Sequence, residues 1–191
     1  MAFNDKEFEL KFRLTDQQFC GVLKILERDG KASRVSTQRD TYLVPRNDNW
    51  LSEEFPYQWL SIRNRNNKNI LNYKHFHPEG VERHLYCDEH EVVVESEDQM
   101  VRLLEALEFV VSVVVEKTRS VFSHLEGVEI SLDTVKELGC FIEIEATRDY
   151  GGIDKTRDRL HAVAKELGVA SCQPDYRGYP FLIYAEKKGD R

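Results

Sequence analysis

Charged side chains recur at every second position in several short segments of this chain. In the segment EFELKF, the charged residues Glu7, Glu9 and Lys11 alternate with large apolar residues. Because side chains in a strand alternate between its two faces, the pattern predicts a strand that carries these charges on one face. Two interpretations are open at this point. The strand is either half-buried with its polar face in water, or part of a barrel whose charged face is an interior site.

Acidic residues at this spacing form one of two charged sets. Carboxylate oxygens are hard ligands for Mg²⁺ and Mn²⁺, which commonly bridge to the phosphates of a substrate. Carboxylates gathered on one face of a sheet therefore predict a site for a divalent metal. The acidic set consists of Glu7, Glu9, Glu89, Glu91, Glu129, Asp133, Glu143 and Glu145.

Basic residues form the second set. Arginine and lysine supply charge and directional donors for phosphate oxygens. A site containing both sets would neutralise a polyphosphate and stabilise the charge that develops during phosphoryl transfer. The sequence has no GxxxxGK, GxGxxG or HExxH motif, so phosphate binding would depend on side chains and metal. The basic set consists of Lys11, Arg63, Arg65, Lys74, Lys117 and Arg119.

Strands greatly outnumber helices among the elements that position these residues. Helical periodicity predicts helices over 15–30, 96–109 and 154–168, and a shorter helical turn after Asp133. Apolar residues that alternate with the charges are expected to be buried under helices: Phe8, Leu10, Phe12, Ile62, Leu71, Tyr73, Val92, Val121, Ile130, Leu132, Ile142 and Ile144. Period-two alternation predicts strands over 7–14, 59–65, 69–76, 88–95, 115–122, 128–133 and 140–146, with a short one over 40–43.

Consecutive strands of this kind predict an α+β fold with a largely antiparallel sheet. An open sheet with its charges in water explains any single strand. It explains the whole set poorly, because like charges recur two residues apart on single strands, where they repel. Seven or eight strands closed into a barrel would place both sets around one cavity and remove exposed sheet edges.

Length and composition restrict the number of domains, the class of partner and the location that the sequence predicts. The 191 residues predict a single domain over residues 1–191, and the net charge of -7 argues against a general nucleic-acid binder. The four cysteines show no metal-ligand spacing, and the apolar run FVVSVVV is too short to cross a bilayer as a helix. No membrane association and a cytoplasmic location are therefore predicted. The pair His75 and His77 is interpreted as a surface loop pair.

Several motifs in order resemble the CYTH proteins, the triphosphate tunnel metalloenzymes. The ExExK pattern of Glu7, Glu9 and Lys11 is followed by RDTYL, SIRNR, EHEVVVES, EKTRSVF and VEISLDTVKELGCFIEIEA, of which the last is the most specific. The match covers about the first 146 residues, and RGYPFLI resembles the family's closing segment. Two positions depart from the family pattern: Cys87 stands where an arginine is common, and Gly178 stands where a serine is usual.

The resemblance implies a closed eight-stranded antiparallel tunnel with helices packed outside and Mg²⁺ or Mn²⁺ inside. It implies catalytic roles for Lys11, Glu9 and Glu143. The implied metal ligands are Glu7, Glu9, Glu143 and Glu145, with Glu89, Glu91 and Asp133 as additional ones. The implied contacts to the triphosphate are Lys11, Arg63, Arg65, Lys74, Lys117 and Arg119, whereas Arg13 lies at the tunnel mouth.

The family contains more than one activity. The short single-domain chain most resembles the class IV adenylate cyclases, which convert ATP to cyclic AMP and pyrophosphate. An inorganic triphosphatase and a thiamine triphosphatase are the alternatives, and a non-catalytic binder of polyphosphate or nucleotide is a third. The expected partner is thus a small triphosphate: ATP, thiamine triphosphate or inorganic triphosphate. The residues leave the oligomeric state open, a homodimer included.

Overall fold

The computed structural model describes residues 6–28, 33–66, 68–124 and 127–189. Contacts divide the chain into two compact units. Unit 1 consists of residues 1–36 and 118–176, and unit 2 of residues 37–117 and 177–191. Strands β3 (Ser33–Pro45) and β7 (Phe109–His124) have residues in both units.

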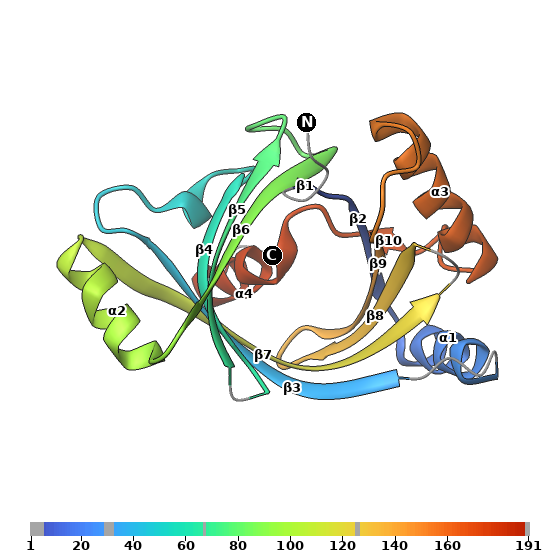
Figure 1. Ribbon diagram of the computed structural model, residues 1–191, viewed down its shortest axis with the longest axis horizontal. Coiled ribbons are helices and arrows are strands. Elements are labelled where there is room, and N and C mark those ends of the chain that lie inside the picture. The colour runs from blue at the N-terminus through green and yellow to red at the C-terminus, as the bar shows by residue number, and fades with distance from the viewer. Residues whose placement is uncertain (1–5, 29–32, 67, 125–126, 190–191) are drawn as a thin grey trace. The chain divides into compact units, whose positions relative to one another are not determined.

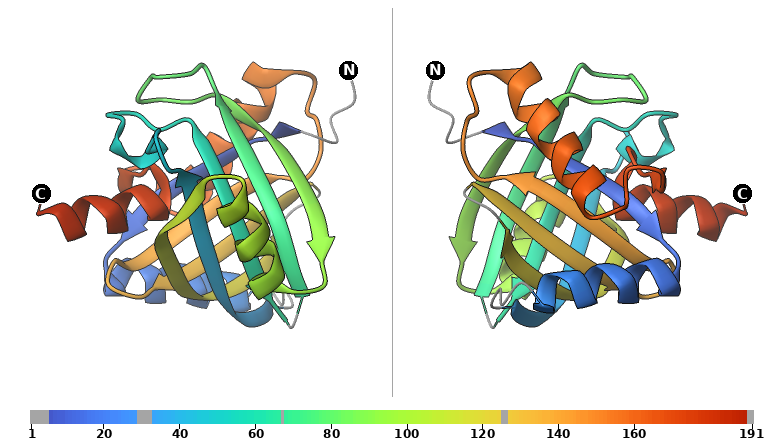
Figure 2. Two further views of the ribbon diagram at one scale, coloured as in Figure 1. Left: turned by 90° about the vertical axis from the view of Figure 1, so that its left-hand side faces the viewer. Right: turned by 90° about the vertical axis from the view of Figure 1, so that its right-hand side faces the viewer.

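Unit 2 is built on strands in the order β6-β5-β4-β3-β7. The pairs β3–β4, β4–β5 and β5–β6 are antiparallel. One face of this sheet packs against α2, where Leu104 joins Leu43, Leu60 and Ile62 in an apolar cluster (Figures 1 and 2). The elements of unit 2, besides its parts of β3 and β7, are η2 (Trp50–Ser52), β4 (Gln58–Arg65), β5 (Lys68–His77), β6 (Tyr86–Val94), α2 (Glu97–Ala106) and α4 (Gly178–Lys188).

Unit 1 has strands in the order β7-β8-β9-β2-β10. Helices α1 and α3 both lie against β9, on the face where Leu10, Phe12, Ile142 and Ile144 are buried (Figure 2, right). The opposite face carries the alternating charges. The elements of unit 1 are β1 (Lys6–Glu7), β2 (Glu9–Leu14), α1 (Asp16–Arg28), β8 (Val128–Val135), β9 (Gly139–Ala146), α3 (Ile153–Glu166) and β10 (Gln173–Pro174).

Two predicted helix starts are confirmed by their caps. At α1, the Thr15 amide donates to Gln18 Oε1 (2.8 Å) and the Gln18 amide donates to Thr15 Oγ1 (3.3 Å). This reciprocal pair satisfies amides that have no partner inside the helix. At α2, Ser96 is the N-cap and its side chain accepts from the Gln99 amide.

Several predictions about the elements need correction. The described residues form ten strands, because β1 and β10, of two residues each, accompany eight longer ones. The helical turn predicted after Asp133 is wrong: β8 runs on to Val135, which pairs with Gly139 across a hairpin turn. Strand β3 is far longer than 40–43, and helix α4 was not predicted.

Burial follows the prediction for most of the alternating apolar residues. Leu71, Tyr73 and Val121 are only partly buried, and Val92 is 55% exposed, which contradicts its prediction. The cluster under α2 draws on β3, β4 and β5 but on no residue of β6, so Val92 has no cover from it. None of the helices, over the residues that the structure describes, is long and apolar enough to cross a membrane.

Candidate functional site

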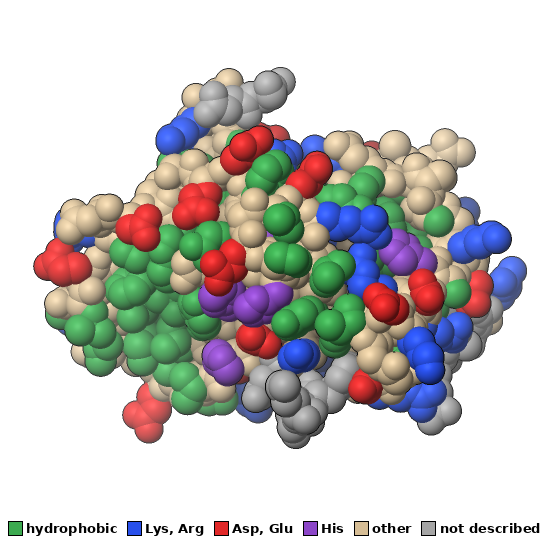
Figure 3. All heavy atoms as spheres, turned by 90° about the horizontal axis from the view of Figure 1, so that it is seen from above, with side chains coloured by type: hydrophobic (Ala, Val, Ile, Leu, Met, Phe, Trp, Pro, Cys, Tyr) green, Lys and Arg blue, Asp and Glu red, His purple; other side chains and the backbone are tan. Residues whose placement is uncertain are grey.

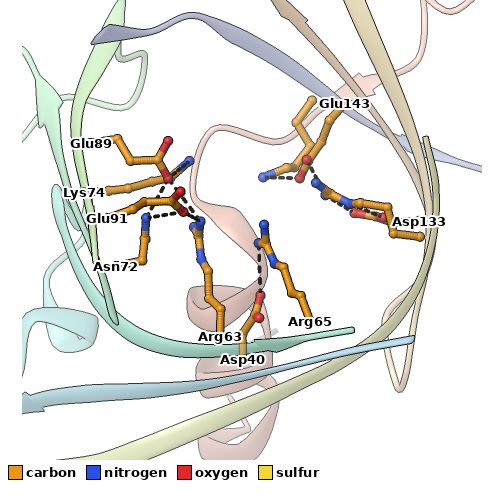
Figure 4. Close-up of polar contacts among 11 residues, drawn as sticks. Asp40, Arg63, Arg65, Asn72, Lys74, Glu89, Glu91, Asp133 and Glu143 are labelled. Atoms are coloured by element: carbon orange, nitrogen blue, oxygen red, sulfur yellow. Dashed lines mark hydrogen bonds and ion pairs between the residues drawn. The ribbon is translucent and has the colours of Figure 1, made fainter. Parts of the chain in front are cut away.

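Each unit carries its own cluster of ion-paired side chains on the charged face of its strands. The unit 1 cluster consists of Glu9, Lys11, Arg119, Asp133 and Glu143. The unit 2 cluster consists of Asp40, Arg63, Arg65, Asn72, Lys74, Glu89 and Glu91. Figure 4 shows most of these side chains and their contacts.

Glu143 is the centre of the unit 1 cluster. It lies opposite Lys11 in the antiparallel pair β2–β9. Lys11 Nζ is 3.1 Å from Glu143 Oε1 and 3.2 Å from Glu9 Oε1. Arg119 bonds the other Glu143 oxygen and also holds Asp133, with 2.7 Å from Arg119 Nε to Asp133 Oδ1 (Figure 4). Two cations thus share one carboxylate.

The charges around Lys11 control its protonation. Burial alone would lower the pKa of the Lys11 ammonium, but the negative charges of Glu143, Glu9 and Asp175 outweigh this effect and raise that pKa well above its usual range. Lys11 therefore stays charged at every physiological pH. A permanent cation beside two carboxylates suits a contact to a phosphate oxygen.

Three carboxylates lie opposite one another across the strands of unit 1, and one of them, Glu9, belongs to the unit 1 cluster. Glu145 lies in register with Glu9 on β2 and with Glu129 on β8. Like charges directly opposite each other across strands destabilise a sheet. A bound cation would relieve this repulsion. Glu7 is buried on β1, but a break at Phe8 separates it from the β2 alternation that carries Glu9.

Arg63 is the centre of the unit 2 cluster. Its Nη1 atom donates to Glu89 Oε1 (3.0 Å) and to Glu91 Oε1 (2.9 Å). Asn72 Nδ2 donates to the same two oxygens, at 2.6 and 3.1 Å. Lys74 Nζ is 3.6 Å from Glu89 Oε1. One arginine and one amide therefore hold two carboxylates together from neighbouring strands (Figure 4).

Sequence reasoning missed two members of this cluster. Asp40 lies opposite Arg63 in the β3–β4 register, and its Oδ2 is 3.9 Å from Arg65 Nη2. Asp40 is buried, and its Oδ1 has no hydrogen-bond partner among the described residues. Asn72 lies in the strand predicted over 69–76, but an uncharged residue belongs to neither charged set. The motif RDTYL contains Asp40 and could have drawn attention to it. Its partner Arg65 could not be predicted, because the contact depends on the register of β3 and β4.

Lys117 and Arg13 have contacts with aromatic rings and backbone. Lys117 Nζ lies 5.0 Å from the centre of the Tyr179 ring, and both residues are buried. Arg13 donates to the backbone oxygen of Leu138 (2.6 Å) and its guanidinium lies over the Phe141 ring. The role of Lys117 as a phosphate contact stays a prediction.

The two departures from the family pattern have local explanations. Gly178 has a φ of +75°, a conformation that favours glycine over serine, and it precedes Tyr179 at the start of α4. Cys87 is buried opposite Phe76 in the β5–β6 pair, where a thiol packs as a small apolar group.

The carboxylates have the donor chemistry that Mg²⁺ or Mn²⁺ requires. No group of three or more potential ligands surrounds a single point among the described residues. The carboxylates therefore fit a hard cation that binds one or two protein carboxylates and completes its coordination shell with water and substrate oxygens. In unit 1, Glu9 and Glu143 share the Lys11 ammonium and are the first candidates.

The histidine pair lies in strand β5 and not in a loop. The rings of His75 and His77 are stacked, with centroids 4.7 Å apart. Each Nε2 contacts a carboxylate, Glu79 at 2.8 Å and Asp88 at 2.9 Å. Figure 3 shows a group of histidines with acidic side chains beside it. Contacts with these carboxylates therefore account for the two histidines, which belong to a network of hydrogen bonds.

The fold and the two clusters define a class: an α+β protein with an antiparallel sheet and a face of paired carboxylates and cations. The model of the CYTH domain matches residues 5–179, and the chain belongs to this family. No curated protein matches the sequence.

Solved structures share the fold over nearly the whole chain. The PH1819 protein of Pyrococcus horikoshii OT3 is 26% identical with a TM-score of 0.73, over 94% of this chain and 99% of that one. A putative adenylate cyclase of Vibrio parahaemolyticus is 20% identical with a TM-score of 0.69, over 93% and 97%. A putative adenylyl cyclase of Hippeastrum, described as having a dominant triphosphatase activity, is 19% identical with a TM-score of 0.64, over 95% of both chains.

Proposed function

We propose that this protein is a metal-dependent enzyme that acts on a triphosphate, most specifically a class IV-type adenylate cyclase. The observation that carries the proposal is the sharing of ion pairs in the two clusters, where Glu143 contacts Lys11 and Arg119, and Arg63 contacts Glu89 and Glu91. Membership of the CYTH family supports it. The closed eight-stranded tunnel and the single domain over residues 1–191 belong to the same proposal.

A metal–triphosphate complex is the ligand that such clusters accept at the least electrostatic cost. An anion alone would take the cations and leave the carboxylates unpaired, and a metal alone would leave the cations unpaired. Either outcome would leave buried charges without partners, which costs a large amount of free energy. A ligand that carries both a divalent cation and phosphate oxygens gives each side chain a new partner. Binding of the metal and of the triphosphate should therefore be cooperative.

The proposed roles follow this division. Glu9 and Glu143 would hold the metal, and Lys11 would hold a phosphate oxygen. The other predicted metal ligands, Glu7, Glu89, Glu91, Asp133 and Glu145, belong to the same proposal. A bound cation would supply Lewis acidity at a phosphate oxygen. The remaining phosphate contacts are Arg63, Arg65, Lys74, Lys117 and Arg119.

The choice between cyclase and hydrolase depends on the nucleophile. A cyclase positions the ribose 3′-oxygen against the α-phosphorus of ATP, whereas a triphosphatase positions water against a terminal phosphorus. The Vibrio protein described as a putative adenylate cyclase has this fold, which favours the cyclase. The Hippeastrum protein, described as having a dominant triphosphatase activity, keeps inorganic or thiamine triphosphate hydrolysis as the second candidate.

One experiment separates these functions. ATP, inorganic triphosphate and thiamine triphosphate are each incubated with the protein in Mg²⁺ and in Mn²⁺, and the products are resolved. Cyclic AMP with pyrophosphate identifies the cyclase, and orthophosphate identifies a triphosphatase. Calorimetric binding of triphosphate without turnover in either metal would identify a non-catalytic binder and overturn the proposal.

A further inference from the structure

Two of the four cysteines, Cys20 and Cys140, lie on α1 and on β9, two elements that contact each other. Cys140, the second residue of β9, is paired through its backbone with Leu14 of β2 and with Thr134 of β8. Helix α1 starts at Asp16, two residues after Leu14. Cys140 Sγ donates to Asp16 Oδ1 at 3.7 Å, so the thiol lies directly against the first turn of α1.

Cys20 occupies the next turn on the same side of that helix. Asp16 and Cys20 are four residues apart, and side chains at this spacing are neighbours on a helix surface. Burial and the contact with Asp16 raise the pKa of the Cys140 thiol, and Cys20 adds to this effect. Cys20 is exposed and Cys140 is half-buried. An oxidant in solution therefore reaches Cys20 first.

We propose that Cys20 and Cys140 form a redox-sensitive pair that a hydroperoxide closes into a disulfide joining α1 to β9. This site is independent of the proposed triphosphate chemistry. It differs from the other two cysteines, Cys87 and Cys172, which are both buried.

The reaction consists of two balanced steps. The Cys20 thiol releases its proton to solvent, and the thiolate attacks one peroxide oxygen and breaks the O–O bond. The departing alkoxide, or hydroxide from hydrogen peroxide, takes a proton from solvent, which leaves Cys20 sulfenic acid and an alcohol or water. The Cys140 sulfur then attacks the Cys20 sulfur, the S–S bond forms and the S–OH bond breaks. Asp16 accepts the Cys140 proton, and the departing hydroxide takes that proton to leave as water. Overall, two thiols lose two electrons to one hydroperoxide.

Asp16 has a specific part in the second step. Burial and the Asp16 carboxylate raise the pKa of the Cys140 thiol, so at neutral pH it attacks only if a base removes its proton. The Asp16 carboxylate is placed to do so through the existing hydrogen bond. Burial is the largest cause of the raised pKa, so the Cys140 thiol stays protonated at neutral pH when Asp16 is replaced. Loss of this base should therefore slow closure of the disulfide at neutral pH, and alkaline pH should restore the rate because the thiolate then forms unaided.

The crosslink would join residues far apart in the sequence and restrict the unfolded chain. A disulfide that closes so long a loop raises the midpoint of thermal unfolding, by roughly 5–10 °C for a domain of this size. The linked strand β9 also carries Glu143, three residues after Cys140. Oxidation therefore fixes the end of the strand that holds a proposed metal ligand.

The test treats the intact protein with hydrogen peroxide, blocks the remaining thiols, and maps peptides by mass spectrometry without reduction. The expected product is a peptide linking Cys20 to Cys140 within one molecule, with a thermal midpoint that rises and that dithiothreitol returns to its starting value. Cys20→Ser and Cys140→Ser should abolish both effects, and Cys172→Ser should keep them.

A matched variant tests the role of the carboxylate. Asp16→Asn should slow disulfide closure severalfold at pH 7 and approach the wild-type rate at alkaline pH. A crosslink between Cys20 residues of two molecules, oxidation of Cys20 to sulfinic acid without a linkage, or a bridge to Cys172 would each overturn the pair. An equal closure rate for Asp16→Asn at pH 7 would overturn the role of Asp16.

Discussion

The two charged clusters are built from the same residue types but are centred on opposite charges. In unit 1 a carboxylate is shared, because Glu143 contacts both Lys11 and Arg119. In unit 2 a cation is shared, because one nitrogen of Arg63 contacts Glu89 and Glu91. A shared carboxylate is suited to exchange its cations for a metal, and a shared arginine is suited to exchange its carboxylates for phosphate. Under the proposed function, we therefore expect metal binding to depend most on Glu143 and substrate binding to depend most on Arg63.

The clusters also differ in burial. The side chain of Asp133 in unit 1 is 0% exposed, whereas that of Glu91 in unit 2 is 44% exposed. Water screens a half-exposed ion pair, so the pair adds little to stability. A fully buried pair contributes a large cost when one partner is removed, because the other charge stays buried without compensation. Asp133 and Glu91 should therefore respond very differently to similar substitutions.

Asp133→Asn should give the largest effect on stability. It removes the carboxylate that holds Arg119 through two nitrogens, whereas the contact of Arg119 with Glu143 stays. We expect a loss of about 3–5 kcal/mol in the free energy of unfolding. Urea denaturation followed by circular dichroism measures it. A loss under 1 kcal/mol would show that the buried pair resembles the exposed one, and the contrast in burial would then have no energetic meaning.

Glu143→Gln should give the largest effect on activity. The amide keeps the size of the side chain but loses the charge that a metal needs and that Lys11 and Arg119 neutralise. We expect turnover of the accepted triphosphate to fall on the order of 100- to 1000-fold. The control is Glu105→Gln on the exposed side of α2, which should keep full activity. Full activity in Glu143→Gln would exclude this residue as a metal ligand.

Arg63→Lys should change substrate binding more than turnover. Lysine keeps the positive charge but loses the planar group with several donors that suits two partners at once. We expect the Michaelis constant for the triphosphate to rise roughly tenfold with a smaller change in kcat. Steady-state kinetics over a range of substrate concentrations separates the two constants. A fall in kcat alone would place Arg63 in the chemical step and remove the contrast between the units.

For both clusters, the sequence predicted which strand face carries each charged residue, because charged and apolar residues alternate along the strands. Lys11, Arg63 and Glu143 lie on the strand faces that period two predicts, since alternation is a property of a single strand. The partners of these residues were not predictable. Asp40 meets Arg65 only through the β3–β4 pairing, and the break at Phe8 interrupts a pattern that looked continuous.

Helices show the same limit. The start of α1 was predictable because Thr15 and Gln18 act on neighbouring amides. Helix α4 was missed because its sequence lacks a clear apolar stripe and has no side-chain cap. The contact of its Tyr179 with Lys117 joins residues distant in the sequence, so local patterns carry no signal for it.

The pH dependence of stability tests whether Lys11 in unit 1 keeps its positive charge. The folded-state pKa of Lys11 is raised above its unfolded value, so its contribution to stability is fully present below about pH 10.5 and is lost as the pH rises through the folded-state pKa. The stability difference between the wild type and Lys11→Gln should thus be equal at about pH 7 and pH 9.5. Urea midpoints at both values measure it. A difference that shrinks between them would mean that Lys11 loses its proton early.

Glu91→Gln should give the smallest effect on stability and so completes the contrast with Asp133. Glu91 shares the Arg63 nitrogen with Glu89, which keeps its contacts to Arg63, Asn72 and Lys74 when the second charge is removed. The free energy of unfolding should change by less than about 1 kcal/mol, because the side chain is half-exposed and the amide oxygen still accepts a hydrogen bond. The same urea titration used for Asp133→Asn measures it. A loss as large as that of Asp133→Asn would mean that the shared arginine depends on both carboxylates, and that the unit 2 cluster is as tightly coupled as that of unit 1.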